Sequence, residues 1–133
     1  LHDGQNLFDA HTAFAGNPWG ADEVAEREVR AGRVPPLILV GVANTADRLN
    51  EYGPQRCGRK RAHDKSREYG RFLAEEVKPF VDSRYRTLAG PAHTGVGGSS
   101  MGGLISLHVC KWHPGVFGRC AAMSPSLWWD REY

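Results

Sequence analysis

The sequence has few sulfur-containing residues and no long apolar run. Three cysteines (Cys57, Cys110 and Cys120) and two methionines occur among 133 residues, and the cysteines lack the close spacing of a zinc site. No apolar stretch approaches the ~20 residues that a membrane-spanning helix needs. We therefore expect free, mostly buried thiols, a mild preference for a reducing compartment, no metal centre and no membrane span.

An excess of one charge is also missing. Seventeen Lys and Arg residues face 15 Asp and Glu residues, which gives a net charge of +2. With no recognition motif present, this balance argues against nucleic-acid binding. The length is that of one small domain. The first residue is Leu1 and not methionine, so we expect the natural N-terminus to lie upstream, and the missing signal-peptide pattern has no bearing on export.

A glycine-rich stretch, residues 97–103, carries the clearest chemical signal in the sequence. Within it, Gly98, Ser100 and Gly102 form the Gly-x-Ser-x-Gly pattern of a nucleophile elbow. The elbow is a strained strand-to-helix turn, in which side chains two residues before and after the serine would collide with neighbouring backbone. We predict that Ser100 is a nucleophile. The alternative is a structural turn around a buried serine.

The flanking segments fit a strand and a helix. Residues 93–98 can form a short buried strand, and residues 101–112 a helix that ends at His113–Pro114. One apolar face of this helix would hold Met101, Leu104, Ile105 and Val109.

Helices and strands are expected to alternate along the remaining chain. Asn17–Pro18 should begin a helix over residues 20–31, ending at Gly32, and Ser66 should cap a helix that bends or ends near Pro79. Residues 37–42 are apolar without alternation, which is typical of a parallel strand covered on both faces, and residues 120–124 form a last strand. The inward side chains would be Ala21, Val24, Ala25 and Val29 in the first helix, and Tyr69, Phe72, Leu73, Val77 and Phe80 in the second. This order predicts an α/β fold with a mostly parallel sheet and flanking helices.

Four segments resemble the Putative esterase family of the α/β-hydrolase superfamily, particularly its enterochelin-esterase-like members. They are residues 2–9, 72–87, 97–104 and 113–129, in the order in which the family has them. The resemblance implies an α/β-hydrolase fold and hydrolysis of a carboxylic ester through an acyl-enzyme, without metal or organic cofactor.

The resemblance also implies roles at matching positions. Ser100 matches the nucleophile, and the N–H of Met101 matches one oxyanion donor. The second donor would be the N–H of Gln5, with Asn6 as the neighbouring possibility. Two fixed N–H groups of this kind stabilise the negative charge that develops on the carbonyl oxygen.

The family places its catalytic acid and histidine further along the chain than Tyr133. We therefore expect residues 1–133 to be the central, incomplete part of a longer domain, inactive alone. In the family's strand order, the strand ending at Leu1 lies between the strand of residues 37–42 and the strand that precedes Ser100. Among the histidines here, His108 and His113 follow Ser100 on its helix and run away from the hydroxyl. His2 stays a candidate base, with turn packing as the alternative, and Asp130 is expected to be a loop residue rather than the acid.

Two further features have alternative interpretations. The basic residues of 56–67 could hold an acidic substrate, although a solvated surface loop is the favoured interpretation. Trp128 and Trp129 follow a strand at the sheet end where ligands of open α/β sheets bind. They could line the substrate site together with Asn6, or they could serve packing.

The predicted substrate is a small-molecule or carbohydrate-linked ester. One alternative is an acyltransferase, similar to the mycolyltransferase relatives of the family, which would use the same acyl-enzyme. Another is a non-catalytic binding protein that kept the fold, against which the intact pattern at Gly98, Ser100 and Gly102 argues.

Overall fold

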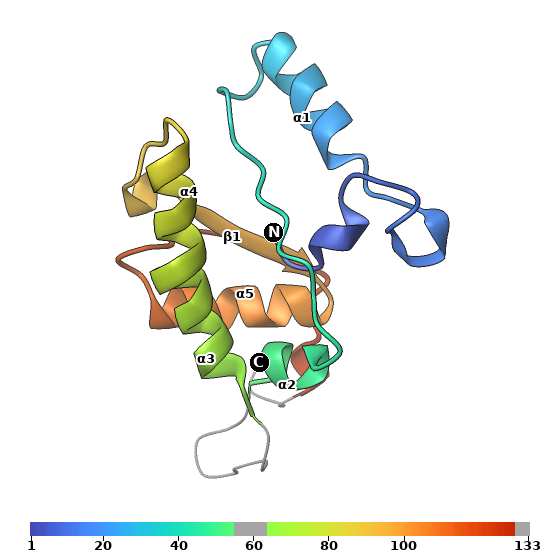
Figure 1. Cartoon of the computed structure of the whole chain (residues 1–133), viewed down its shortest axis with the longest axis vertical. Coiled ribbons are helices and arrows are strands. Elements are labelled where there is room, and N and C mark those ends of the chain that lie inside the picture. The colour runs from blue at the N-terminus through green and yellow to red at the C-terminus, as the bar shows by residue number, and fades with distance from the viewer. Residues whose placement is uncertain (55–63, 130–133) are drawn as a thin grey trace. The chain divides into compact units, whose positions relative to one another are not determined.

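The computed structural model describes residues 1–54 and 64–129 and divides the chain into two compact units, Leu1–Asn44 and Thr45–Tyr133 (Figure 1). Several residues named above lie outside the described ranges: most of the basic stretch, including Cys57 and His63, and also Asp130. None of the helices in residues 1–54 and 64–129 combines the length and the apolarity needed to cross a bilayer.

The first unit contains two short 3-10 helices, η1 (Gly4–Asn6) and η2 (Phe14–Gly16), followed by helix α1 (Ala21–Arg30). Helix α1 matches the predicted helix, but Asn17–Pro18 do not begin it. Gly20 precedes it in the left-handed conformation, with φ 59°, and this turn sets the direction in which the helix starts. Val24 was expected to face inward and is instead 42% exposed, whereas Ala21, Ala25 and Val29 are half-buried.

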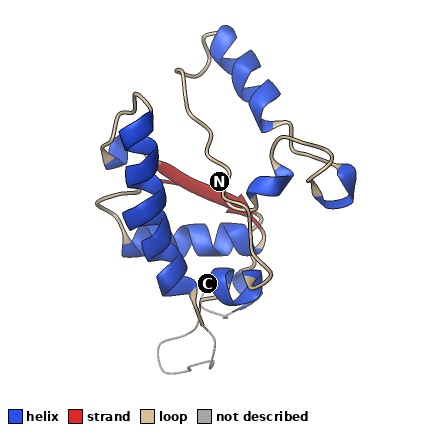
Figure 2. Cartoon of the chain, viewed as in Figure 1, coloured by secondary structure: helices blue, strands red, loops and turns tan. Residues whose placement is uncertain are grey.

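The predicted two-sided strand at residues 37–42 does not form. The segment is extended and is drawn as loop in Figure 2, and Leu37 and Ile38 are 46% and 48% exposed. A strand needs a hydrogen-bonded neighbour along its length. Among the described residues, only residues 1–4 pair with this segment, through a parallel bridge between His2 and Val42. That bridge confirms the expected neighbourhood of the chain start and residues 37–42.

The second unit is an α/β arrangement with a small parallel sheet. Strands β1 (Gly95–Ser99) and β2 (Arg119–Met123) pair in register from Gly95 opposite Arg119 to Ser99 opposite Met123. Between them in sequence runs helix α5 (Met101–Trp112), which packs against both strands. The other elements are α2 (Arg48–Tyr52), α3 (Ser66–Arg71), the π-helical η3 (Phe72–Val77), α4 (Lys78–Arg84) and the 3-10 helices η4 (Pro91–His93) and η5 (Leu127–Trp129).

Elements α3, η3 and α4 follow one another without a break (Figure 1). Of the two outcomes predicted near Pro79, a bend or an end, the helix does not end there. Proline lacks an N–H and crowds the carbonyl four residues earlier, and the wider π turn of η3 accommodates it. Ser66 is the first helical residue, not the cap, and Asp64 Oδ1 accepts its N–H at 2.9 Å and its hydroxyl at 2.6 Å. Phe72 and Phe80 are exposed, contrary to expectation, while Tyr69 and Leu73 are buried.

Helix α5 has the bounds and the apolar face that the sequence predicts. Leu104, Ile105 and Val109 are fully buried and Met101 is 4% exposed. His108 on the same helix is also buried, so it belongs to the core. Burial raises the pKa of the Cys110 thiol to about 11, so at neutral pH it is a protonated, weakly polar group. Cys110 and Cys120 are free, and Cys120 is exposed rather than buried.

Candidate active site

Ser100 occupies the turn between β1 and α5. The strand ends at Ser99, the helix begins at Met101, and Ser100 between them has φ 57° and ψ −120°. A positive φ is uncommon for a residue with a side chain and marks local backbone strain. The residue is exposed. The predicted order of strand, turn and helix is therefore present, with the serine at the strained position.

The glycines beside Ser100 are required by close backbone approach. A Cβ added to Gly98 would lie 2.9 Å from the carbonyl carbon of Gly102 and 3.0 Å from its Cα and oxygen. A Cβ on Gly103 would lie 3.1 Å from the carbonyl oxygens of Gly98 and Met123. Since the neighbours are backbone atoms, they cannot rotate away. The collision predicted for the residue two before the serine is confirmed.

The last residue of β2 and the segment after it contact three atoms of Ser100. The Ser100 N–H donates to the carbonyl of Met123 at 3.0 Å, and the Ser100 carbonyl accepts the N–H of Ser126 at 3.1 Å. The two hydroxyls, Ser100 Oγ and Ser126 Oγ, are 3.0 Å apart. Ser126 is 3% exposed, so its hydroxyl approaches Ser100 from the protein interior.

Sequence analysis gave Ser126 no role. Twenty-six residues separate it from Ser100, and no local pattern links the two. The signal that could have found it is the parallel pairing of the two strands. Both strands end at the same edge of the sheet, which brings the residue after Ser99 close to the residues after Met123.

The N–H of Met101 is available at the start of α5. The first N–H groups of a helix have no intrahelical acceptor and carry its partial positive charge. Within the described residues no acceptor for the Met101 N–H is found. The residue after Ser100 therefore has a backbone donor that is available to bind an anionic oxygen.

Gln5 and Asn6 lie in η1 of the first unit and differ in the use of their N–H groups. The Asn6 N–H donates to the carbonyl of Asp3 at 2.9 Å, whereas the Gln5 N–H has no acceptor among the described residues. Asn6 is occupied further, because its side chain accepts the N–H of Phe14 at 2.9 Å. Of the two predicted alternatives, Gln5 thus has the available donor.

Asn44 anchors this turn and was missed by sequence analysis. Its side-chain amide donates to Asp3 Oδ1 at 2.6 Å, and its N–H donates to Gln5 Oε1 at 3.2 Å. The turn also lies against the extended segment, since a Cβ on Gly4 would come within 2.5 Å of the Gly41 carbonyl carbon. The backbone around Gln5 is therefore held in place within its own unit.

The two tryptophans of η5 have different environments. Trp128 is 73% exposed, while Trp129 is half-buried and covers Gly53, where a Cβ would lie 2.8 Å from the indole ring. The ring centroids are 6.0 Å apart and the planes meet at 66°. Trp129 therefore has the packing role, and Trp128, two residues after Ser126, presents its ring to solvent.

The described part of the basic stretch is engaged within the chain. Lys65 forms an ion pair with Asp47, and this hydrogen bond raises the pKa of Lys65. The Arg67 guanidinium lies over the Trp112 ring, 4.0 Å from its centroid. Both cations are therefore engaged by side chains of this chain, and Arg67 belongs to α3 and not to a loop.

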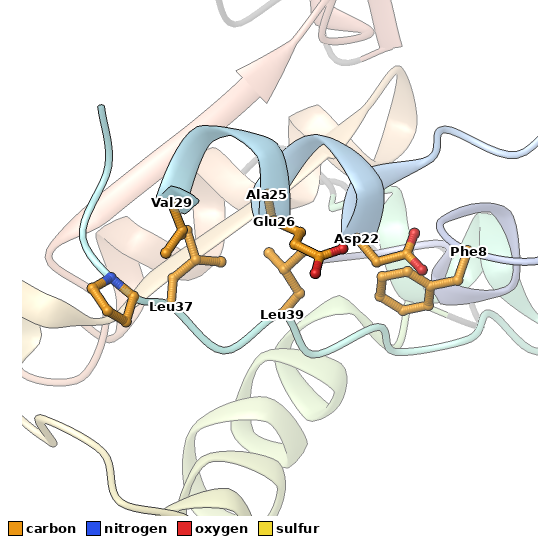
Figure 3. Close-up of a pocket in the computed structure, with 8 residues that line it drawn as sticks. Phe8, Asp22, Ala25, Glu26, Val29, Leu37 and Leu39 are labelled. Atoms are coloured by element: carbon orange, nitrogen blue, oxygen red, sulfur yellow. The ribbon is translucent and has the colours of Figure 1, made fainter. Parts of the chain in front are cut away.

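A pocket of about 390 Å³ lies within the first unit, between α1 and the extended segment (Figure 3). Its walls are apolar, apart from the carboxylates of Asp22 and Glu26, which Figure 3 shows on the α1 side. The described residues that line the pocket include no serine, cysteine or histidine. The pocket therefore offers no nucleophile-and-base pair for acyl transfer.

Two of the histidines considered as bases have different surroundings. His2 is buried in the first unit at 1% exposure, and His113 caps the end of α5 opposite the serine. Within residues 1–54 and 64–129, no three His, Cys, Asp or Glu side chains gather closely enough to hold a metal ion.

The family model described as Putative esterase matches residues 1–133. The chain belongs to the Putative esterase family. Curated relatives include the siderophore enterobactin esterase of Emericella nidulans, 36% identical over 60% of this chain and 26% of that protein. The siderophore triacetylfusarinine C esterase of Aspergillus fumigatus is 36% identical over 44% of this chain and 20% of its own length. The uncharacterized protein YbbA of Bacillus subtilis is 26% identical over 98% of this chain and 50% of its own length.

The chain thus spans half or less of the length of these relatives. No solved structure matches it.

Proposed function

We propose that the protein is a serine carboxylic-ester hydrolase of the α/β-hydrolase fold, of which this chain forms the central part. Ser100 would attack the ester carbonyl and carry the acyl group. The observation that carries the proposal is the exposed Ser100 at φ 57° between a parallel strand and a helix, with Gly98 pressed against Gly102. This geometry lifts a serine hydroxyl clear of the sheet, as a nucleophile elbow requires.

The proposed oxyanion hole consists of the N–H groups of Met101 and Gln5. Both lack an acceptor among the described residues, which supports their assignment. Attack by Ser100 turns the carbonyl oxygen into an oxyanion, and each fixed donor contributes about 3 kcal/mol to its stabilisation. A histidine and a carboxylate elsewhere in the protein would take the serine proton and return it to the leaving alcohol.

The substrate proposal combines the relatives with Trp128. Two of the relatives are named as siderophore esterases, so siderophore esters are the first class to test. An exposed indole beside the Ser126 segment offers a flat apolar surface to an aromatic or sugar-bearing acyl group. Small-molecule and carbohydrate-linked esters of other kinds form the comparison set.

Labelling with a fluorophosphonate probe tests the proposed nucleophile. We expect the full-length protein to form one covalent adduct, located at Ser100 by mass spectrometry, because only an activated serine attacks such probes rapidly. The matched control is Ser99→Ala, which removes the neighbouring hydroxyl and should leave the adduct in place. A folded protein that stays unlabelled would favour the non-catalytic alternative. Product analysis with an added alcohol then separates hydrolysis from acyl transfer.

Replacing Trp128 with alanine tests the substrate surface. We expect KM for an aromatic acyl ester to rise about five- to ten-fold, because one aromatic contact contributes about 1 kcal/mol. KM for the corresponding acetyl ester should stay unchanged, which makes the substrate pair its own control. Initial rates over a range of ester concentrations give both constants. Equal effects on the two esters would remove Trp128 from the proposed site.

A further inference from the structure

The hydroxyl of Ser126 is, among the described residues, the side-chain group that contacts Ser100 Oγ. The two oxygens are 3.0 Å apart, and either can be the donor. Ser126 is 3% exposed, and the described residues give its hydroxyl no other hydrogen-bond partner. A buried hydroxyl needs a partner, so this pair is the means by which Ser126 satisfies its own polar group.

The backbone of Ser126 is fixed independently of its hydroxyl. Its N–H donates to the Ser100 carbonyl at 3.1 Å, and its carbonyl accepts the N–H of Trp129 at 3.0 Å. Ser124, two residues earlier, has φ 41°, so the chain turns sharply as it leaves β2. These contacts aim the side chain of Ser126 at the Ser100 hydroxyl and would persist without the Ser126 oxygen.

We propose that Ser126 is a positioning residue that donates its hydroxyl hydrogen bond to Ser100 Oγ during catalysis. The inference rests on the proposed role of Ser100. If Ser100 donated to Ser126, its proton would be directed into the protein, away from a base. When Ser126 donates, one lone pair of Ser100 Oγ accepts its hydrogen. The Ser100 proton is then free to leave on the exposed side.

The role of Ser126 spans both halves of the reaction. In acylation, Ser100 Oγ forms a bond to the carbonyl carbon, its proton passes to the base, and the alcohol leaves with that proton. In deacylation, water attacks, the bond from the acyl carbon to Oγ breaks, and Oγ takes the electron pair and regains a proton from the base. Ser126 keeps its own proton throughout. Its hydrogen bond is strongest while negative charge lies on Oγ, which occurs in both steps.

The test removes the Ser126 hydroxyl alone. In the full-length protein, Ser126→Ala should lower kcat and the fluorophosphonate labelling rate by about ten-fold or more, the effect of one hydrogen bond to a developing charge. KM should stay within two-fold, since both steps slow together, and the thermal midpoint should stay unchanged. The matched control is Ser106→Ala, which removes another buried hydroxyl, bonded to the Gly102 carbonyl at 2.7 Å and not to Ser100. It should label at the wild-type rate.

The outcomes distinguish this inference from the proposed function. If Ser100→Ala prevents labelling but Ser126→Ala labels as fast as wild type, Ser126 has no positioning role and Ser100 remains the nucleophile. The inference is also overturned if Ser126→Ala labels more slowly but its thermal midpoint falls in proportion to the lost labelling rate. The same holds if Ser106→Ala loses as much labelling rate as Ser126→Ala. If Ser100→Ala retains labelling and hydrolysis, the proposed function itself is wrong.

Discussion

Replacing Ser100 with alanine should lower kcat for ester hydrolysis in the full-length protein by about 10⁴-fold or more. The change removes the oxygen that would form the acyl-enzyme, and loss of a nucleophile in a serine hydrolase leaves only the contribution of the oxyanion donors and binding. KM should change little, because the hydroxyl contributes mainly to the transition state. Initial rates with a chromogenic ester measure both constants.

Folding should not explain the loss of activity in Ser100→Ala. Alanine meets the same positive φ of 57° as serine does, so the strain of the turn is unchanged. Ser100→Gly should be equally inactive and at least as stable, since glycine adopts this conformation without a Cβ penalty. An alanine variant that retains more than a tenth of the activity would place the nucleophile at another residue.

Replacing Gly98 with alanine should destabilise the protein by about 3 kcal/mol, the upper range for overpacking. The new Cβ would lie 2.9 Å from the Gly102 carbonyl carbon, and both partners are backbone at the junction of β1 and α5. The thermal midpoint should fall by about 10 °C. Activity should fall as well in the fraction that stays folded, because a shift of the turn would move Ser100 relative to the proposed oxyanion donors. Thermal denaturation and the labelling rate give the two readings.

Gly95 supplies the control on the same strand. A Cβ there meets Arg119 Cβ at 3.4 Å, an ordinary contact, so Gly95→Ala should change the free energy of unfolding by less than about 0.5 kcal/mol. Equal destabilisation of the two variants would show that the loss at Gly98 reflects the strand in general. The loss of stability at Gly98 would then be no evidence for close packing in the turn at Ser100.

The features that the sequence predicted well depend on residues close together in the chain. The bounds of α5 follow from glycine-rich residues at its start, an apolar face and His113–Pro114 at its end. The strand–serine–helix turn has the same local origin. The helix from Ser66 was also predictable, with a bend or an end near Pro79 as alternatives. The π turn of η3 was not predictable, because a π turn that relieves a proline leaves no mark in the residue pattern.

The features that the sequence missed depend on neighbours distant in the chain. Residues 37–42 have the composition of a buried strand, yet their hydrogen bonds to described residues are limited to residues 1–4. Asn44 and Ser126 are polar residues in ordinary loops, and their contacts with Gln5 and Ser100 follow from folding over 39 and 26 residues. Composition indicates what a segment can bury, whereas these contacts need the register of paired segments.

The hydrogen bonds from Ser100 to Met123 and Ser126 also set an order of events during protein synthesis. Chains emerge from the ribosome with the N-terminal part first. The partners of the Ser100 N–H and carbonyl follow Ser100 by 23 and 26 residues, so they are still to be added when α5 has already emerged. The strained turn can therefore be completed only after residue 126 is available. Until that point, the nascent chain carries Ser100 without the two backbone partners that hold it in the strained turn.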